Sequence, residues 1–164
     1  MNVQVPERIV MFCLLALCGV TRVWAESLSI TVSVTVVTPP PCVINNNKTI
    51  DVDFGSSVSI PAIDGQHYQK NISYTVVCTG ATSNAMKMQI SGTATAFDST
   101  ALQTTKTGLG VALRKNGNPL NIGDWFNFTY PTLPTLQAVL VKKSGATLNT
   151  GDFSAAATLA VEYQ

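Results

Sequence analysis

Apolar and small polar residues alternate in two segments near opposite ends of the chain. In the first segment, serines and threonines separate the apolar residues Leu28, Ile30, Val32, Val34 and Val36. In the second, one phase holds Phe153, Ala155, Ala157, Leu159, Val161 and Tyr163. A period of two is that of a β-strand with one apolar face, so both segments are predicted strands.

Further strand-like runs lie between these segments, at intervals typical of a β-sandwich. The predicted strands are 49–54, 72–78, 85–91, 109–114, 125–129, 135–142 and 153–163. Turn signals separate them, among them 97–99 and Asn116-Gly117, two residues that tolerate positive φ. No internal repeat or linker divides the chain, which favours one domain.

Three consecutive prolines, Pro39 to Pro41, stand between the first alternating segment and Cys42. Proline lacks a backbone N–H and forms a stiff, extended spacer. Residues 26–41 are therefore interpreted as a strand set off from the body by a proline hinge. Two interpretations stay open: the two end segments pair inside one closed sandwich, or the first adds to an open edge of a partner. Five buried side chains of this kind offer on the order of 10 kcal/mol before entropy losses.

The first 25 residues have the features of a secretory signal peptide. Arg8 precedes an apolar stretch over 9–20, and the segment ends in the small residue Ala25. The stretch is shorter than the ~20 residues that span a bilayer, and no second one follows, so we expect no membrane anchor. Removal of residues 1–25 leaves 139 residues with eight basic and eight acidic side chains.

Composition narrows the class further. Hydrophobic residues make up 46% of the chain, aromatic ones 7% and charged ones 12%, a balance that favours an all-β protein over a helical bundle. No basic excess indicates nucleic acid as a partner. Cys42 and Cys78 are the cysteines outside the signal segment, and in an oxidising compartment they predict one disulfide. On the chain-entropy model this bond stabilises the fold by roughly 4 kcal/mol.

Three segments resemble the pilin subunits of chaperone–usher fimbriae. They are 40–46 (Pro-Pro-Cys-Val-Ile-Asn-Asn), 50–55 (Ile-Asp-Val-Asp-Phe-Gly) and 151–164, in which Gly151 is fourteenth from the carboxyl end and Tyr163 is penultimate. Both spacings match the chaperone-recognition pattern of that family. The likeness covers nearly all of residues 26–164, and the opening motif is most similar to a minor tip-adaptor subunit of P-type pili.

The resemblance implies an incomplete immunoglobulin-like sandwich that lacks its last strand and carries an N-terminal donor-strand extension. Its parts would be a signal peptide (1–25), the extension (26–41) and the pilin domain (42–164). A periplasmic chaperone would lend a strand to the groove beside the terminal strand and hold the carboxylate of Gln164. At the outer-membrane usher, the extension of the next subunit would displace it, so neighbouring fimbrial subunits are the expected partners. The subunit would pass through the periplasm to the cell surface.

By the same resemblance, two sets of residues acquire roles. The donor strand would insert Leu28, Ile30, Val32, Val34 and Val36 into the groove of another subunit. The groove edge and chaperone contact would comprise Gly151, Phe153, Ala155, Ala157, Leu159, Val161, Tyr163 and Gln164, and Ile44 would help line the groove. The family extension usually holds one glycine, and none lies between Glu26 and Pro41. Either the receiving groove is roomier there or the register is shifted.

Other functions have weaker support. His67 is the only histidine, two cysteines are too few for a structural zinc site, and 53–55 (Asp-Phe-Gly) lacks the companion motifs of a kinase. We therefore expect no catalytic residues, metal or cofactor. The alternative function is a glycan-binding fimbrial adhesin, in which Trp125, Phe126, Phe128 and Tyr130 would form a sugar-stacking surface.

Overall fold

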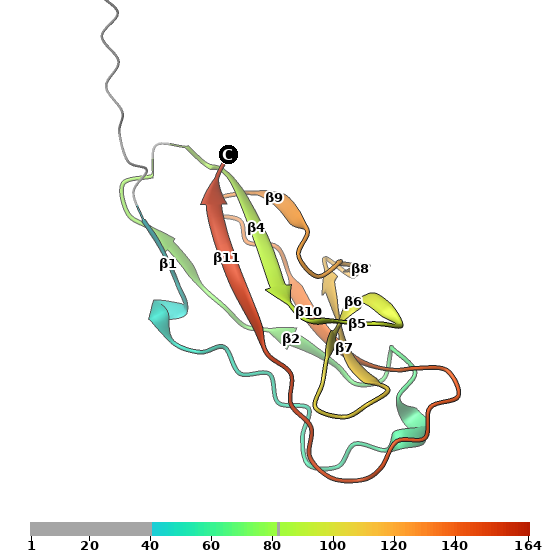
Figure 1. The fold of residues 1–164 in the computed structure, drawn as a ribbon. Coiled ribbons are helices and arrows are strands. Elements are labelled where there is room, and N and C mark those ends of the chain that lie inside the picture. The colour runs from blue at the N-terminus through green and yellow to red at the C-terminus, as the bar shows by residue number, and fades with distance from the viewer. Residues whose placement is uncertain (1–40, 82) are drawn as a thin grey trace, which may run out of the picture. The chain divides into compact units, whose positions relative to one another are not determined.

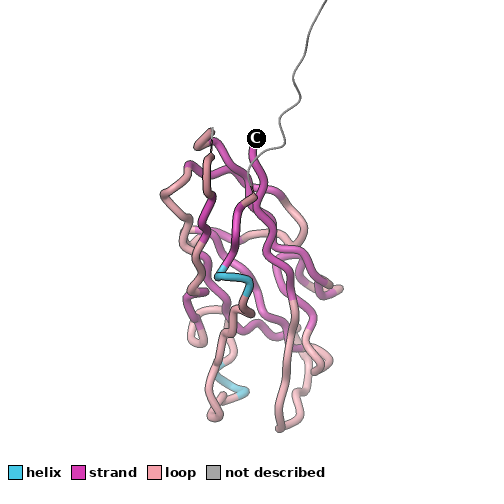
Figure 2. The backbone as a smooth tube through the Cα atoms, turned by 90° about the vertical axis from the view of Figure 1, so that its left-hand side faces the viewer, coloured by secondary structure: helices cyan, strands magenta, loops and turns pink. Residues whose placement is uncertain are grey.

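A computed structural model describes residues 41–81 and 83–164, so the signal segment and nearly all of the extension lie outside the described residues. This part of the chain forms strands joined by loops and two single-turn 3₁₀ helices (Figure 2). The helical turns are η1 (Asn45–Asn47) and η2 (Ile60–Ala62). The strands are β1 (Cys42–Ile44), β2 (Gln69–Ile72), β3 (Val76–Cys78), β4 (Ala85–Gly92), β5 (Ala94–Thr95), β6 (Asp98–Gln103), β7 (Leu109–Lys115), β8 (Asn118–Pro119), β9 (Trp125–Thr129), β10 (Leu136–Lys142) and β11 (Ala157–Tyr163).

The strands form two antiparallel sheets and a short ribbon (Figure 1). The larger sheet has the order β2-β10-β7-β6-β5, with β8 beside β7, and the smaller sheet has the order β11-β4-β9. The ribbon pairs β1 with β3. Side chains from both sheets meet in one apolar core, which makes the body an all-β, immunoglobulin-like sandwich.

Every second residue of the central strands faces this core. The inward set includes Met86, Met88 and Ile90 on β4, Leu109, Val111 and Leu113 on β7, and Leu136, Ala138 and Leu140 on β10. A strand alternates its side chains between two faces, so these apolar positions fix which face of each strand packs inward. A one-residue slip would turn the set to solvent.

Four predicted strands are confirmed closely: β4, β7, β9 and β10. The predicted strand 72–78 is instead two strands, because β2 pairs with β10 of the larger sheet while β3 pairs with β1. Tyr74 lies in the gap and donates its hydroxyl hydrogen to the carbonyl of Pro134 at 2.6 Å. Burial raises the pKa of this Tyr74 hydroxyl to about 12.

Three other expectations differ from the structure. Residues 49–54 form no strand, and the last strand begins at Ala157 rather than at residue 153. The turn predicted at 97–99 lies earlier, because Asp98 already belongs to β6. There the Thr95 hydroxyl donates to the Asp98 carbonyl and accepts from the Asp98 N–H, which closes the turn between β5 and β6.

Cys42 and Cys78 lie directly opposite each other in the β1–β3 ribbon and are joined by a disulfide. Cys78 is buried in the core, while Cys42 is half-buried. The bond ties the first residue of β1 to the last residue of β3, and so fixes where the body of the chain begins.

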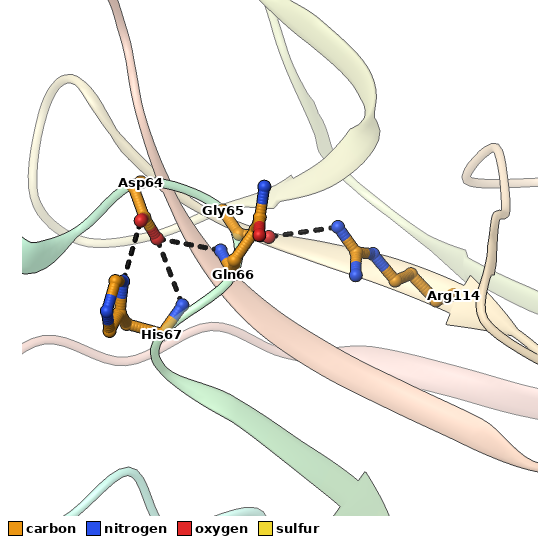
Figure 3. Close-up of polar contacts among 5 residues, drawn as sticks. All are labelled: Asp64, Gly65, Gln66, His67 and Arg114. Atoms are coloured by element: carbon orange, nitrogen blue, oxygen red, sulfur yellow. Dashed lines mark hydrogen bonds and ion pairs between the residues drawn. The ribbon is translucent and has the colours of Figure 1, made fainter.

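The loop that precedes β2 is organised by one carboxylate (Figure 3). Asp64 accepts hydrogen bonds from the backbone N–H groups of Gln66 (2.9 Å) and His67 (3.0 Å), and its second oxygen lies 2.6 Å from His67 Nδ1. Arg114 on β7 donates to the Gly65 carbonyl at 2.9 Å. The hydrogen bonds that Asp64 accepts from Gln66 and His67, first among them the one from the His67 N–H, lower the pKa of Asp64 from 3.8 to about 2.

The pKa of Asp64 gives a test of this loop. Because its value in the folded chain lies below the ordinary one, the ionised carboxylate stabilises the loop above about pH 4, and this stabilisation is lost as the pH falls through about 2. A carboxyl-carbon NMR titration should therefore show a midpoint near 2 for Asp64. Asp64→Asn should accelerate amide exchange at Gln66 and His67. A midpoint near 3.8 would contradict the bonding described.

Candidate functional site

One wall of the candidate site is the stretch that follows β1. Along it Ile50, Val52 and Phe54 are half-buried while Asp51 and Asp53 are exposed, the alternation of a strand with one apolar face. None of the backbone hydrogen bonds among the described residues involves 50–54. The stretch therefore has the side-chain pattern of a strand but no neighbouring strand among residues 41–81 and 83–164.

The opposite wall is the outer edge of β11. The N–H of Gln164 donates to the carbonyl of Ala85, and hydrogen-bonded pairs alternate along an antiparallel ladder. Thr158, Ala160 and Glu162 thus bond with β4, while the backbone groups of the residues between them point away from it. The backbone N–H and C=O groups of Ala157, Leu159, Val161 and Tyr163 therefore lie on an open edge of the sheet.

Contacts between the two walls mark a long, narrow groove. Beyond one end of the groove, Cys42 Sγ on β1 lies 3.6 Å from the Tyr163 hydroxyl. Further along, the rings of Phe54 and Phe153 are 6.2 Å apart between centroids, tilted by 41°. Along the chain, twelve residue steps separate Cys42 from Phe54, and ten separate Phe153 from Tyr163.

The space between the walls is apolar at its base. Its volume is about 880 Å³, and its floor is made by buried residues of the central strands, chiefly Leu109, Val111, Leu113, Leu136 and Ala138. Lys106 is the basic side chain that lines it. Among the residues that the structure describes, no three potential metal ligands cluster together. The groove is thus suited to apolar side chains carried on an extended backbone.

Hydrogen bonds from the loop between β6 and β7 of the larger sheet hold the loop before β11 in place. Lys106 donates its ammonium hydrogen to the Thr150 carbonyl at 2.9 Å, and Thr105 and Ser154 exchange two hydrogen bonds. Gly151 has a φ of +105°, which side chains disfavour. A Cβ at this position would lie 3.5 Å from Lys106 Nζ. Gly151 therefore allows the chain to turn next to Lys106 before it continues into the wall that ends in β11.

The structure places the expected edge residues along this wall. Those that line the groove are Gly151, Phe153, Ala155, Ala157 and Leu159. Val161 and Tyr163 continue the same face of β11 beyond it and pack against the core. Gln164 bonds through its side chain to the Met86 carbonyl at 2.7 Å. Ile44 packs against the core instead of lining the groove.

The first wall was missed as part of a site, although its signal is present in the sequence. Ile50, Val52 and Phe54 alternate with polar residues, and this pattern predicts a strand. It does not show that the strand lacks a partner. The five donor residues Leu28 to Val36 lie outside the described residues, so their role stays a prediction.

The aromatic row expected for an adhesin does not form one surface. Phe126 is buried in the core, and Phe128 and Tyr130 pack against it. Trp125 faces outward, 39% exposed, with Lys87 Nζ 4.7 Å from its ring centroid. The aromatic side chains from Trp125 to Tyr130 therefore alternate because one face of the strand packs on the core and the other faces outward.

An all-β sandwich with an open groove beside its last strand defines the class of the protein. The fimbrial protein family matches residues 29–164. A fimbrial-like protein of Escherichia coli K12, YfcR, is 34% identical over 145 residues, which cover 85% of this chain and 83% of that protein.

Two solved structures have similar folds. The P pilus rod subunit PapA has a TM-score of 0.61 and 25% identity, covering 76% of this chain and 99% of that one. The P pilus adaptor subunit PapF has a TM-score of 0.57 and 24% identity, covering 77% of this chain and 98% of that one. A rod subunit and an adaptor therefore share this fold.

The chain belongs to the fimbrial protein family. It is a structural subunit of a fimbrium with the pilin fold, and not an enzyme. As such it is exported through the periplasm and forms part of surface pili.

The open edge of β11 predicts an alternating pattern of hydrogen exchange. In the refolded chain, kept cold and too dilute to associate, the amides of Leu159 and Val161 should exchange quickly, and those of Ala160 and Glu162 slowly. The amides of the first pair point away from β4, and those of the second pair bond with β4. NMR-detected exchange measures both. Equal protection of all four amides would contradict an open edge.

Proposed function

We propose that this subunit joins the fimbrium by donor-strand exchange. Its groove accepts a β-strand from a neighbouring subunit, and its own segment 26–41 supplies the strand for another. The observation that carries the proposal is a pair of walls without backbone partners facing each other over an apolar floor. Assembled in this way, the subunit supports adhesion as part of the fibre.

A donated strand fits the groove in two respects. Its backbone would bond with β11 through the outward groups of Leu159, Val161 and Tyr163, and through 50–54 on the other wall. Its apolar side chains would cover the floor, each contributing ~1.5–3 kcal/mol when fully buried. Strand addition of this kind takes its affinity from main-chain bonds and its specificity from alternate side chains.

Before assembly the same groove needs another occupant. An exposed edge above an apolar core invites aggregation, so we propose that a periplasmic chaperone fills the groove until the outer-membrane usher brings in the next subunit. Gly151 to Gln164 form the contact with the chaperone in this proposal. Residues 1–25 act as the signal peptide that sends the chain to this compartment.

Deletion of residues 26–37 tests the donor role. The shortened chain keeps its groove, so it should be recovered from the periplasm in complex with the chaperone at the level of the full chain. It should be absent from sheared fimbriae, because it has no strand to give to the subunit ahead. Immunoblots of both fractions measure this, and normal assembly of the shortened chain would refute the donor role.

A matched pair of substitutions tests which face of the extension inserts. Val34→Asp places a charge on the predicted inward face, and Thr35→Asp places the same charge on the outward face. Loss of one buried valine alone is worth about tenfold, and a buried carboxylate adds to it. We expect incorporation into fimbriae to fall at least tenfold for Val34→Asp and less than twofold for Thr35→Asp. The reverse result would mean a register shifted by one residue, and no effect of either would contradict insertion.

A further inference from the structure

Among the described residues, the side chains at one end of the body are all uncharged, and the charge that lies there is the terminal carboxylate of Gln164. We call this end the uncharged end and define it by residues 41–44, 77–81, 83–85, 129–132 and Gln164. Hydrogen bonds tie these segments together: Gln164 N–H to the Ala85 carbonyl, Tyr130 N–H to the Asn84 carbonyl, and Cys78 N–H to the Tyr130 hydroxyl. Lysine, arginine, aspartate and glutamate are absent from 71–86 and from 125–141.

The opposite end of the body is charged. Asp53, Lys106, Lys143 and Asp152 lie on the loops there. The backbone bond from Lys143 N–H to the Gly108 carbonyl joins two of those loops. The charged side chains of the described residues therefore lie away from the uncharged end.

Apolar and neutral groups are exposed at the uncharged end. Val77 on β3 is 48% exposed, the higher value of the two large exposed hydrophobic residues among those described, and it pairs with half-buried Val43 on β1. Thr79, Asn84 and Pro131 are exposed around them. Depletion of Lys, Asp and Glu with retained Tyr and apolar side chains is the composition of an interface core.

The chain leaves the body for its extension at this same end, because Pro41 and Cys42 belong to it. If residues up to Val36 occupy another subunit's groove, only residues 37–41 connect that groove to Cys42. Val36 and Cys42 are six residue steps apart, which at ~3.1–3.3 Å per step span about 20 Å. The uncharged end must then face the receiving subunit at close range.

We infer that the uncharged end is a second contact surface, which docks on the body of the subunit whose groove receives this chain's extension. The inference rests on the proposed donor-strand exchange and adds a body-to-body contact to it. That contact excludes water from Val77 and Val43, and it limits the angle between successive subunits. Its partner surface lies at the mouth of the receiving groove.

Photo-crosslinking in assembled fimbriae tests the docking. Benzoylphenylalanine is incorporated at position 34 in one variant, at position 79 in a second and at position 107 in a third, each in the full chain. Position 34 reports which subunit receives the extension. We expect position 79 to crosslink to that same subunit and position 107, at the charged end, not to do so.

The outcomes separate the two proposals. A crosslink from position 34 to a subunit, with none from position 79 or one only to the chaperone or to a different subunit, would overturn the docking and leave donor-strand exchange intact. Failure of position 34 to crosslink any subunit would refute donor-strand exchange, and the docking inference with it.

A pair of charge substitutions gives a second measurement. Thr79→Lys and Thr107→Lys are matched, because both threonines are exposed and each precedes a glycine of positive φ, Gly80 (74°) and Gly108 (82°). Both variants should form the chaperone complex at normal levels. We expect Thr79→Lys to lower incorporation into fimbriae several-fold and Thr107→Lys to leave it unchanged. Equal incorporation of the two variants would contradict a desolvated contact at the uncharged end.

Discussion

The fold depends on one constraint: backbone groups that border an apolar core need hydrogen-bond partners. In the part of the chain that the structure describes, the stretch 50–54 and the outer edge of β11 border the core without such partners. Buried backbone groups in native proteins are almost always paired, and water supplies partners here only while the groove stays open. Strand donation between molecules solves the problem by completing the sheet with a segment of another chain.

Local signals predicted much of the fold. β4 and β9 alternate in sequence because each has one face on the core and one outside, whereas β7 and β10 are apolar runs buried on both faces. The last strand is likewise apparent from Leu159, Val161 and Tyr163. The division of 72–78 into β2 and β3 was not predictable, because it depends on each half pairing with a different sheet, and partners distant in the sequence decide that.

The candidate site was half predictable for the same reason. The wall from Gly151 to Tyr163 follows from the terminal alternation and from the resemblance to pilins. Residues 50–54 look like any edge strand in the sequence, and only the three-dimensional arrangement shows that they have no neighbour. The sorting of charge away from the uncharged end is visible in the sequence as two long stretches without Lys, Arg, Asp or Glu, but their meeting at one end depends on the fold.

Thermal unfolding of residues 26–164, measured alone and in complex with the periplasmic chaperone, tests the central claim most directly. A strand that buries several apolar side chains is worth several kcal/mol after entropy losses, or a shift in melting temperature of roughly 10–30 °C for a domain of this size. The account predicts that the lone chain melts lower by this amount and aggregates as its concentration rises. A lone chain that stays monomeric and melts cooperatively at the temperature of the complex would contradict it.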